Sequence, residues 1–239
     1  MKYSPYILLA SLAISFPAFS SQTLQLNGID SNYIQPVSIT FNNNTESVYT
    51  GAITGSLGGF NPIFFCYDLS HNINVPGTYS VNPTSPSASF PNYLGLSSAF
   101  NLQVVSSLLN NANVGSFTSV NQYSGLQLAI WSILYNWTPS SHSTTTLGTA
   151  TDPFSSSVTG AVLSDALGFL STANTFVTDN TYSTSFGGVQ VLVNANDSEG
   201  NVTQTLAGIQ VPEPQTYLIL GTLSVLVLAV ARKKKAIKL

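Results

Sequence analysis

Basic residues are almost absent from the body of this 239-residue chain. All six lysines and arginines are either Lys2 or lie at Arg232 and beyond. Between Ser21 and Gln210 the charged side chains are carboxylates, accompanied by two histidines. Proteins that bind nucleic acid neutralise its phosphates with clustered lysine and arginine, so this segment excludes nucleic acid as a partner. Its surface must consist mainly of uncharged polar residues, which suits a protein outside the cell.

Cysteine is the second scarce residue, because Cys66 is the only one in the chain. An intramolecular disulfide is therefore excluded. Cysteine is among the most buried residue types, and the flanking Phe64, Phe65 and Tyr67 favour a buried strand.

Two histidines are too few for a dedicated metal site, and the chain lacks the nucleophile elbow of a serine hydrolase. We expect no cofactor and rank a secreted hydrolase low.

The N-terminal end has the pattern of a secretory signal peptide. Lys2 is followed by an apolar run over residues 6–16, and then by small residues at Ala18 and Ser20. This order predicts a signal peptide over residues 1–20, which leaves an exported domain over 21–210. The apolar run is short for a membrane span, so an uncleaved anchor is the weaker alternative.

A proline-containing motif, an apolar run and a basic cluster follow one another at the C-terminal end. The motif consists of Val211, Pro212, Glu213 and Pro214, where proline disfavours helix. The apolar run over 216–231 predicts a transmembrane helix that is somewhat short for a bilayer. The basic membrane stop consists of Arg232, Lys233, Lys234 and Lys235. Such a cluster predicts that this end of the helix faces the cytoplasm.

Residues 211–239 resemble the PEP-CTERM sorting signal of Gram-negative bacteria, with the same parts in the same order. The resemblance implies an exosortase-type sorting enzyme as a partner. It also implies transient anchoring in the inner membrane, followed by transfer to the cell surface or the extracellular matrix. A plain C-terminal membrane anchor is the alternative, because a basic stop fits both.

The pattern of the exported domain predicts an α+β fold. Alternating or short apolar runs predict strands over 22–26, 37–41, 47–54, 63–69, 78–81, 188–193 and 202–211. Glycines over 55–59 predict a break after the third of these strands. Apolar residues at spacings of three and four predict helices over 94–111, 120–136 and 154–173. We therefore expect a β-sandwich or barrel-like part with an inserted helical subdomain.

Cys66 and Gln127 together suggest a specific chemistry. A thiol held against a glutamine carboxamide, with water excluded, can expel ammonia and store the acyl group as a thioester. Gln127 lies four residues before Trp131 on the expected helix, so both share one face and the indole can cover the bond. Phe65 and Tyr67 flank the cysteine and are expected to exclude water.

The same residues resemble the thioester domains of bacterial surface adhesins. Their first motif is matched by Phe65-Cys66-Tyr67-Asp68. Their last motif is matched by Gln127-Leu128-Ala129-Ile130-Trp131, although Leu126 stands where threonine is common. The resemblance covers about residues 47–194 and implies a Cys66–Gln127 thioester that attaches the protein covalently to amine-bearing targets. Such a bond reacts once, so the resemblance implies a single-turnover covalent adhesin at most and not an enzyme.

The first alternative to this interpretation is a non-covalent structural or adhesive matrix protein, in which Cys66 is a buried thiol and Gln127 a boundary residue. The second alternative is a secreted hydrolase, which we rank low because nothing in the sequence nominates its nucleophile.

The absence of lysine between Ser21 and Gln210 has two interpretations of its own. It would spare a thioester from attack by an amine of the same domain, but a composition bias of extracellular proteins explains it equally well.

Overall fold

The computed structural model describes residues 22–81, 99–182, 191–196 and 202–209 of the chain. The predicted signal peptide, sorting motif, transmembrane helix and basic stop lie outside these residues. Across the described ranges, no helix combines the length and the apolar character needed to cross a membrane.

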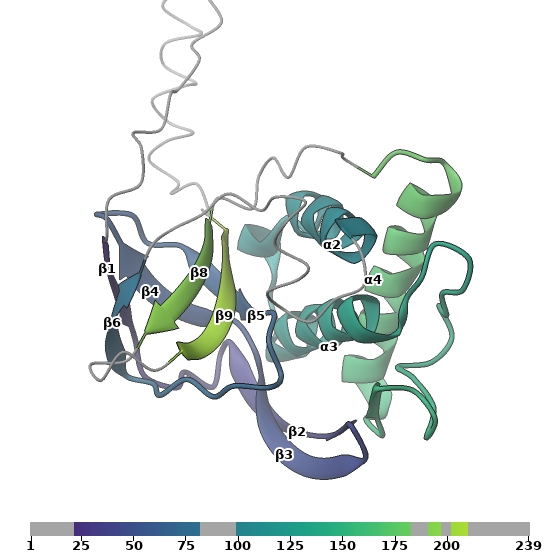
Figure 1. The fold of residues 1–239 in the computed structure, drawn as a ribbon, viewed down its shortest axis with the longest axis horizontal. Coiled ribbons are helices and arrows are strands. Elements are labelled where there is room, and N and C mark those ends of the chain that lie inside the picture. Colours follow the sequence, from purple (N-terminus) through teal and green to yellow (C-terminus); the bar gives the residue numbers. More distant parts are fainter. Residues whose placement is uncertain (1–21, 82–98, 183–190, 197–201, 210–239) are drawn as a thin grey trace, which may run out of the picture.

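Six of the described strands form a closed antiparallel barrel in the order β1, β4, β5, β9, β8, β6. They are β1 (Gln22–Leu26), β4 (Ile53–Leu57), β5 (Ile63–Cys66), β6 (Gly77–Val81), β8 (Val191–Asn196) and β9 (Val202–Ile209). The barrel closes because β1 pairs with β4 along one edge and with β6 along the other. Figure 1 shows the barrel beside a separate group of helices.

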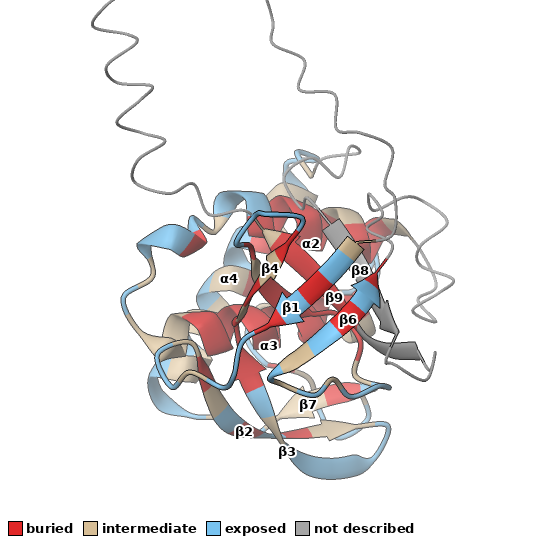
Figure 2. Cartoon of the chain, turned by 90° about the vertical axis from the view of Figure 1, so that its left-hand side faces the viewer, coloured by how far each residue is buried: buried red, intermediate tan, exposed pale blue. Residues whose placement is uncertain are grey.

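Alternation of side chains explains why these segments form a barrel. Along β1 and β6, buried and exposed residues alternate, as Figure 2 shows. Leu24 and Leu26 of β1, and Tyr79 and Val81 of β6, are buried in the core. Successive side chains of a strand point to opposite faces of the sheet, so an alternating sequence places apolar side chains inward and polar side chains outward. The α+β prediction is confirmed, and its β part is a barrel.

A second sheet of three strands lies below the barrel and the helices in Figure 1. It contains β2 (Ile34–Phe41), β3 (Asn44–Gly51) and β7 (Phe154–Ser156), with β2 in the centre. Asn42 and Asn43 join β2 to β3 with φ angles of 48° and 65°. Two residues of positive φ match the twist of a tight hairpin, and asparagine tolerates them better than most residues.

Helices α2 (Ala99–Asn111), α3 (Val120–Asn136) and α4 (Gly160–Thr178) lie between β6 and β8 in the chain, as the insertion model expects. A short 3₁₀ turn, Val114–Ser116, separates α2 from α3. Residues 123–134 of α3 are all buried, because α2, α4 and the β2–β3–β7 sheet surround this helix. A capping box between Ser119 and Gln122 starts it.

The end of α3 is held by a buried asparagine on α2. Asn101 Nδ2 lies 2.9 Å from the carbonyl oxygens of Ile133 and Leu134, and 3.1 Å from that of Trp137. The last carbonyls of a helix have no partners within the helix, so this amide supplies a donor where one is needed. It thereby fixes α3 relative to α2.

The predicted strand over 47–54 and the end of the predicted strand over 63–69 are wrong. The first is divided at Ala52 between β3 of one sheet and β4 of the other, and Gly55, one of the glycines expected to break the strand, lies within β4 against β1. A Cβ atom at that position would come within 2.5 Å of the Gln25 carbonyl oxygen. β5 ends at Cys66 and does not continue to Leu69, although Tyr67 remains buried.

The predicted helix over 154–173 is wrong at its start. Residues Phe154–Ser156 form β7, and α4 begins at Gly160 and continues to Thr178. The Asn136 side chain binds both backbone groups of Phe154, with Nδ2 2.7 Å from its oxygen and Oδ1 3.1 Å from its nitrogen. Phe154 also pairs with Phe41 of β2. These distant contacts hold the segment as a strand.

The close contact between α3 and α4 generates a stability prediction. A Cβ atom on Gly125 of α3 would lie 2.7 Å from Asp165 Cβ and 2.9 Å from the Ala166 nitrogen. We expect Gly125→Ala to lower the free energy of unfolding by about 1–3 kcal/mol, because the helices must separate. Gly168→Ala on α4 is the control, since its Cβ meets nothing within 4 Å. Urea denaturation showing equal effects of both changes would contradict the close packing.

Candidate functional site

Cys66 lies at a point where the barrel leaves one edge of β5 uncovered. On one side β9 accompanies the strand, with Cys66 opposite Leu206 and the Tyr67 N–H donating to the Thr205 oxygen at 2.8 Å. On the other side β4 pairs with β5 only at Ile63 and Phe64. The backbone N–H and C=O of Cys66 therefore need hydrogen-bond partners other than β4.

The Gln127 side chain supplies both partners. The Cys66 N–H donates to Gln127 Oε1 at 2.8 Å, and Gln127 Nε2 donates to the Cys66 carbonyl oxygen at 2.7 Å. The Gln127 side chain thus takes the place of a neighbouring strand at this position. Gln127 is 1 % exposed and Cys66 is 7 % exposed, so the contact is shielded from solvent.

The spacing of residues along α3 explains how Gln127 reaches β5. Gln127, Trp131 and Tyr135 lie four residues apart and therefore share one helix face. The Tyr135 hydroxyl accepts from the Leu69 N–H at 3.0 Å and donates to the Tyr67 carbonyl oxygen at 3.1 Å. α3 is consequently bound to the chain both at Cys66 and just after it.

The two hydrogen bonds fix both polar atoms of the Gln127 carboxamide. The Cys66 N–H polarises the carbonyl at Oε1, as a backbone donor does in an oxyanion hole. The Cys66 carbonyl oxygen holds the amide nitrogen. The carboxamide is therefore in a buried contact with the backbone of the residue that bears the thiol.

Burial determines the protonation of the thiol. Removal from water, with a smaller effect of the nearby Asp68 carboxylate, raises the pKa of Cys66 to about 12. The thiol is therefore protonated at neutral pH. A cysteine that acts as a repeated nucleophile has a lowered pKa, whereas burial raises the pKa of Cys66.

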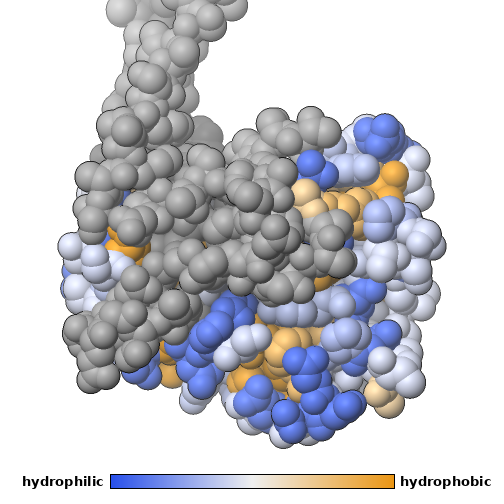
Figure 3. Space-filling model, viewed as in Figure 1, coloured by the Kyte–Doolittle hydropathy of each residue, from blue (hydrophilic) through white to orange (hydrophobic). Residues whose placement is uncertain are grey.

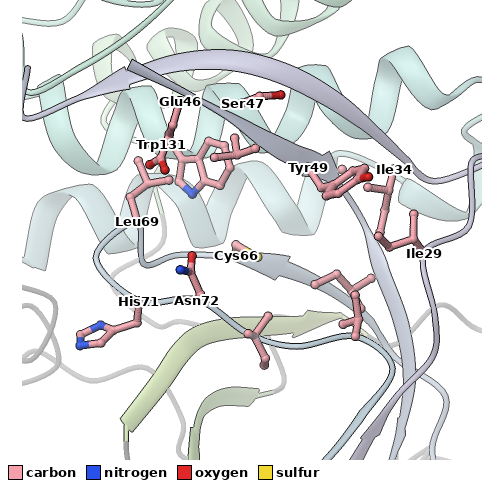
Figure 4. Close-up of a pocket in the computed structure, with 15 residues that line it drawn as sticks. Ile29, Ile34, Glu46, Ser47, Tyr49, Cys66, Leu69, His71, Asn72 and Trp131 are labelled. Atoms are coloured by element: carbon pink, nitrogen blue, oxygen red, sulfur yellow. The ribbon is translucent and has the colours of Figure 1, made fainter. Parts of the chain in front are cut away.

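A cavity of about 350 Å³ gives access to the Cys66 side (Figure 4). It lies between the β2–β3 hairpin, α3 and the segment after β5. Its lining residues come from these elements, from the loop before β2, and from the start of β4 and the end of β5: Ile29, Ile34, Glu46, Ser47, Val48, Tyr49, Gly51, Ile53, Cys66, Leu69, His71, Asn72, Ile73, Val75 and Trp131.

Trp131 presents an unused donor to this cavity. Its indole Nε1 is buried and has no hydrogen-bond partner among the described residues. In Figure 4 this nitrogen is on the side of the ring that faces Cys66. Buried donors are rarely left in this state in folded proteins. Trp131 therefore leaves one unsatisfied donor at the wall of the cavity.

A carboxylate and an imidazole form a pair just after Cys66. Asp68 Oδ2 and His71 Nδ1 are 2.5 Å apart, and Asp68 Oδ1 accepts from the Ser70 N–H at 2.7 Å. Asp68 is buried, whereas His71 is partly exposed at the cavity. Asp68 thus orients the imidazole at the rim of the cavity.

The structure brings together three of the sequence-predicted site residues, namely Cys66, Gln127 and Trp131. Phe65 and Tyr67 are fully buried next to Cys66, but the described cavity does not include them, because neighbours on a strand point to opposite sides. Val211, Pro212, Glu213, Pro214, Arg232, Lys233, Lys234 and Lys235 lie outside the described residues.

Sequence reasoning missed Tyr135, Glu46 and Asn72. The four-residue spacing after Gln127 and Trp131 is a signal that could have identified Tyr135. Glu46 and Asn72 reach the cavity through the fold of the hairpin and of the loop after β5. No local pattern marks them.

Comparison with known proteins gives two similar structures. The N-terminal domain of the Streptococcus pyogenes pilus tip adhesin Cpa matches 78% of this chain and 98% of its own, with TM-score 0.41 and 13% identity. The N-terminal thioester domain of the fibronectin-binding protein SfbI from Streptococcus pyogenes matches 79% of this chain and 98% of its own, with TM-score 0.37 and 12% identity. No family model and no curated protein sequence matches the chain.

The two hydrogen bonds can be tested without any thioester. Cys66→Ala removes the sulfur but keeps both bonds, because they use backbone atoms of residue 66. In that background we expect Gln127→Leu to lower the free energy of unfolding by about 2–4 kcal/mol, since two buried backbone groups lose their partners. Urea denaturation of the single and double variants measures the difference. Equal stability of the two would contradict the pairing.

Proposed function

We propose that this protein is an exported surface or matrix protein that attaches covalently to amines through a Cys66–Gln127 thioester. The observation that carries the proposal is the buried pairing of the Gln127 carboxamide with the backbone of Cys66. It holds the acyl donor against the residue that bears the thiol, and a cavity leads to the same residue.

The thioester would form by an intramolecular acyl transfer. The Cys66 sulfur attacks the Gln127 side-chain carbon, and the Cys66 N–H stabilises the negative oxygen of the intermediate. The carbon–nitrogen bond then breaks, the thiol proton leaves with the nitrogen, and ammonia is released. Proximity replaces a slow bimolecular encounter, and the loss of ammonia to solvent draws the reaction forward.

The attachment step would be aminolysis of the thioester. A primary amine enters the cavity and attacks the Gln127 acyl carbon. The carbon–sulfur bond breaks, a proton passes from the amine nitrogen to the sulfur, and an amide bond joins the target to Gln127. The raised pKa of Cys66 favours the protonated thiol as the product. The Trp131 N–H is a donor that the entering group can use.

Export completes the proposal. The signal peptide over residues 1–20 and the sorting tail over 211–239 would deliver the domain across the membrane, with an exosortase-type enzyme as processing partner. The domain would be anchored transiently in the inner membrane and then reach the cell surface or the matrix. The amine-bearing target would lie there.

The other candidate function is that of a non-covalent structural or adhesive matrix protein. Its supporting observation is the burial of Cys66 and the raised pKa of its thiol, which are typical of an inert core cysteine. Under this alternative Gln127 serves only to complete the strand edge. The experiment below separates the two functions.

The thioester predicts a specific change in intact mass. Purified protein should be lighter than its encoded chain by one ammonia, and incubation with methylamine should add one methylamine to that mass. Cys66→Ala should keep the encoded mass and take up no amine. Thiol titration in denaturant should find no thiol before methylamine and one thiol after it. The encoded mass with a titratable thiol from the start would overturn the thioester and leave the matrix alternative.

The absence of lysine between Ser21 and Gln210 generates a further prediction. Asn72 lines the cavity with Cys66, and Figure 4 shows its side chain beside the cysteine. We expect Asn72→Lys to discharge the thioester internally, which gives a titratable thiol and abolishes methylamine uptake. Asn72→Arg is the matched control, because guanidinium has the same charge but is a poor nucleophile, and it should keep the thioester.

The two variants test whether the absence of lysine protects the thioester. Peptide mapping of Asn72→Lys should show a cross-link between residues 72 and 127. If the lysine and arginine variants keep equally long-lived thioesters, the absence of lysine between Ser21 and Gln210 has no protective role.

A further inference from the structure

Glu46 of β3 occupies an unusual position for an acidic residue. It pairs with Ile39 of β2, so the two side chains are on the same face of the hairpin. Ile39 is only 1 % exposed, because this face packs against the core. Glu46 is near the open end of that face, where it is exposed and lines the cavity with Cys66. Figure 4 shows its side chain extending toward Trp131.

Glu46 differs from the other acid near the site. The Asp68 carboxylate accepts a hydrogen bond from the Ser70 N–H and contacts the imidazole of His71. Among the described residues, Glu46 has no ion pair. The sequence adds that no lysine or arginine lies between Ser21 and Gln210, so this segment contains no strong base that could neutralise it. The carboxylate is thus available to a charge that comes from another molecule.

We propose that Glu46 makes the cavity selective for primary amines in positively charged surroundings, such as a lysine within a basic stretch of polypeptide. This inference rests on the proposed thioester. Primary amines approach as ammonium ions at neutral pH, and a carboxylate at the mouth raises their local concentration. The same charge repels amines that carry a carboxylate nearby.

Glu46 also suits the reaction itself. When a neutral amine attacks the Gln127 acyl carbon, positive charge develops on its nitrogen until the proton moves to sulfur. A carboxylate on that side of the cavity stabilises this charge in the transition state, where stabilisation increases the rate. Glu46 is neither consumed nor covalently changed in this step.

The opposite end of the cavity is apolar. Ile29 and Tyr49, which are 49% and 60% exposed, line it there, and Figure 4 shows them near Ile34 and away from Glu46. Figure 3 shows hydrophobic surface bordered by hydrophilic residues next to the β2–β3 hairpin. Exposed apolar side chains at a cavity mouth provide a surface for hydrocarbon groups. A long alkyl amine, such as the lysine side chain, can contact the apolar end with its hydrocarbon and Glu46 with its charge, whereas ammonia or a short polar amine cannot do both.

The test compares three four-carbon primary amines that differ in a second charge: butylamine, putrescine and γ-aminobutyrate. Intact mass follows their uptake by the full-length wild-type protein, by Glu46→Gln and by Asp179→Asn. Asp179 is exposed at the end of α4 and does not line the cavity, so this control matches the change in net charge. Comparing variants for each amine cancels the intrinsic reactivity of the amine.

We expect Glu46→Gln to slow putrescine uptake by about three- to tenfold, the effect of one charge at close range in water. The same substitution should increase the rate of γ-aminobutyrate uptake. Its effect on the rate of butylamine uptake should lie between its effects on the other two amines. Asp179→Asn should resemble the wild type for all three amines. At about 1 M salt, where charges are screened within about 3 Å, the differences should disappear.

Two failures are distinguishable. If the wild-type protein takes up none of the three amines, the thioester is absent and the proposed function fails with this inference. If it takes up all three and the Glu46→Gln variant keeps the same ratios between them, the thioester stands. In that case the assignment of Glu46 as the selecting residue is overturned.

Discussion

The pairing of the Gln127 side chain with the backbone of Cys66 is the interaction on which the arrangement of this protein depends. β4 accompanies β5 only as far as Phe64, so two buried backbone groups at Cys66 need partners from elsewhere. Leaving a buried donor or acceptor without a hydrogen bond costs about 1–3 kcal/mol. An amide offers one donor and one acceptor in a plane and can serve both groups, whereas a carboxylate offers acceptors alone. A glutamine therefore suits this strand edge, and under the proposed function the same amide is the acyl donor.

This requirement also explains the helical insertion. Gln127 lies 61 residues after Cys66, and it must arrive at the strand edge in a fixed orientation. Asn101 holds the end of α3, Gly125 permits α4 to pack closely behind it, and Tyr135 ties the same helix face to the chain after β5. A buried helix fixed on three sides can position one side chain more accurately than a loop. The insertion thus serves as the support for a single amide.

Sequence reasoning identified the elements better than it identified their ends. Alternation of apolar residues predicted the strands, and the spacing around Trp131 predicted α3, because both patterns are local. β5 stops at Cys66 because its next partner is a side chain from a distant helix, which no local pattern records. Phe154 is a strand residue for a similar reason, since Asn136 holds its backbone. The Cys66–Gln127 pair was predicted from the chemistry of the two side chains and from motif resemblance. The position of Glu46 at the cavity depends on its register with Ile39 of the neighbouring strand, which the sequence does not reveal.

Under the proposed function, one property of the sequence meets two requirements of the site. A thioester would need protection from amines of its own chain, and the carboxylate of Glu46 at the cavity mouth would need a cation from another molecule. A segment without lysine or arginine meets both conditions. The composition that excludes nucleic acid as a partner would then also favour an external amine over an internal one.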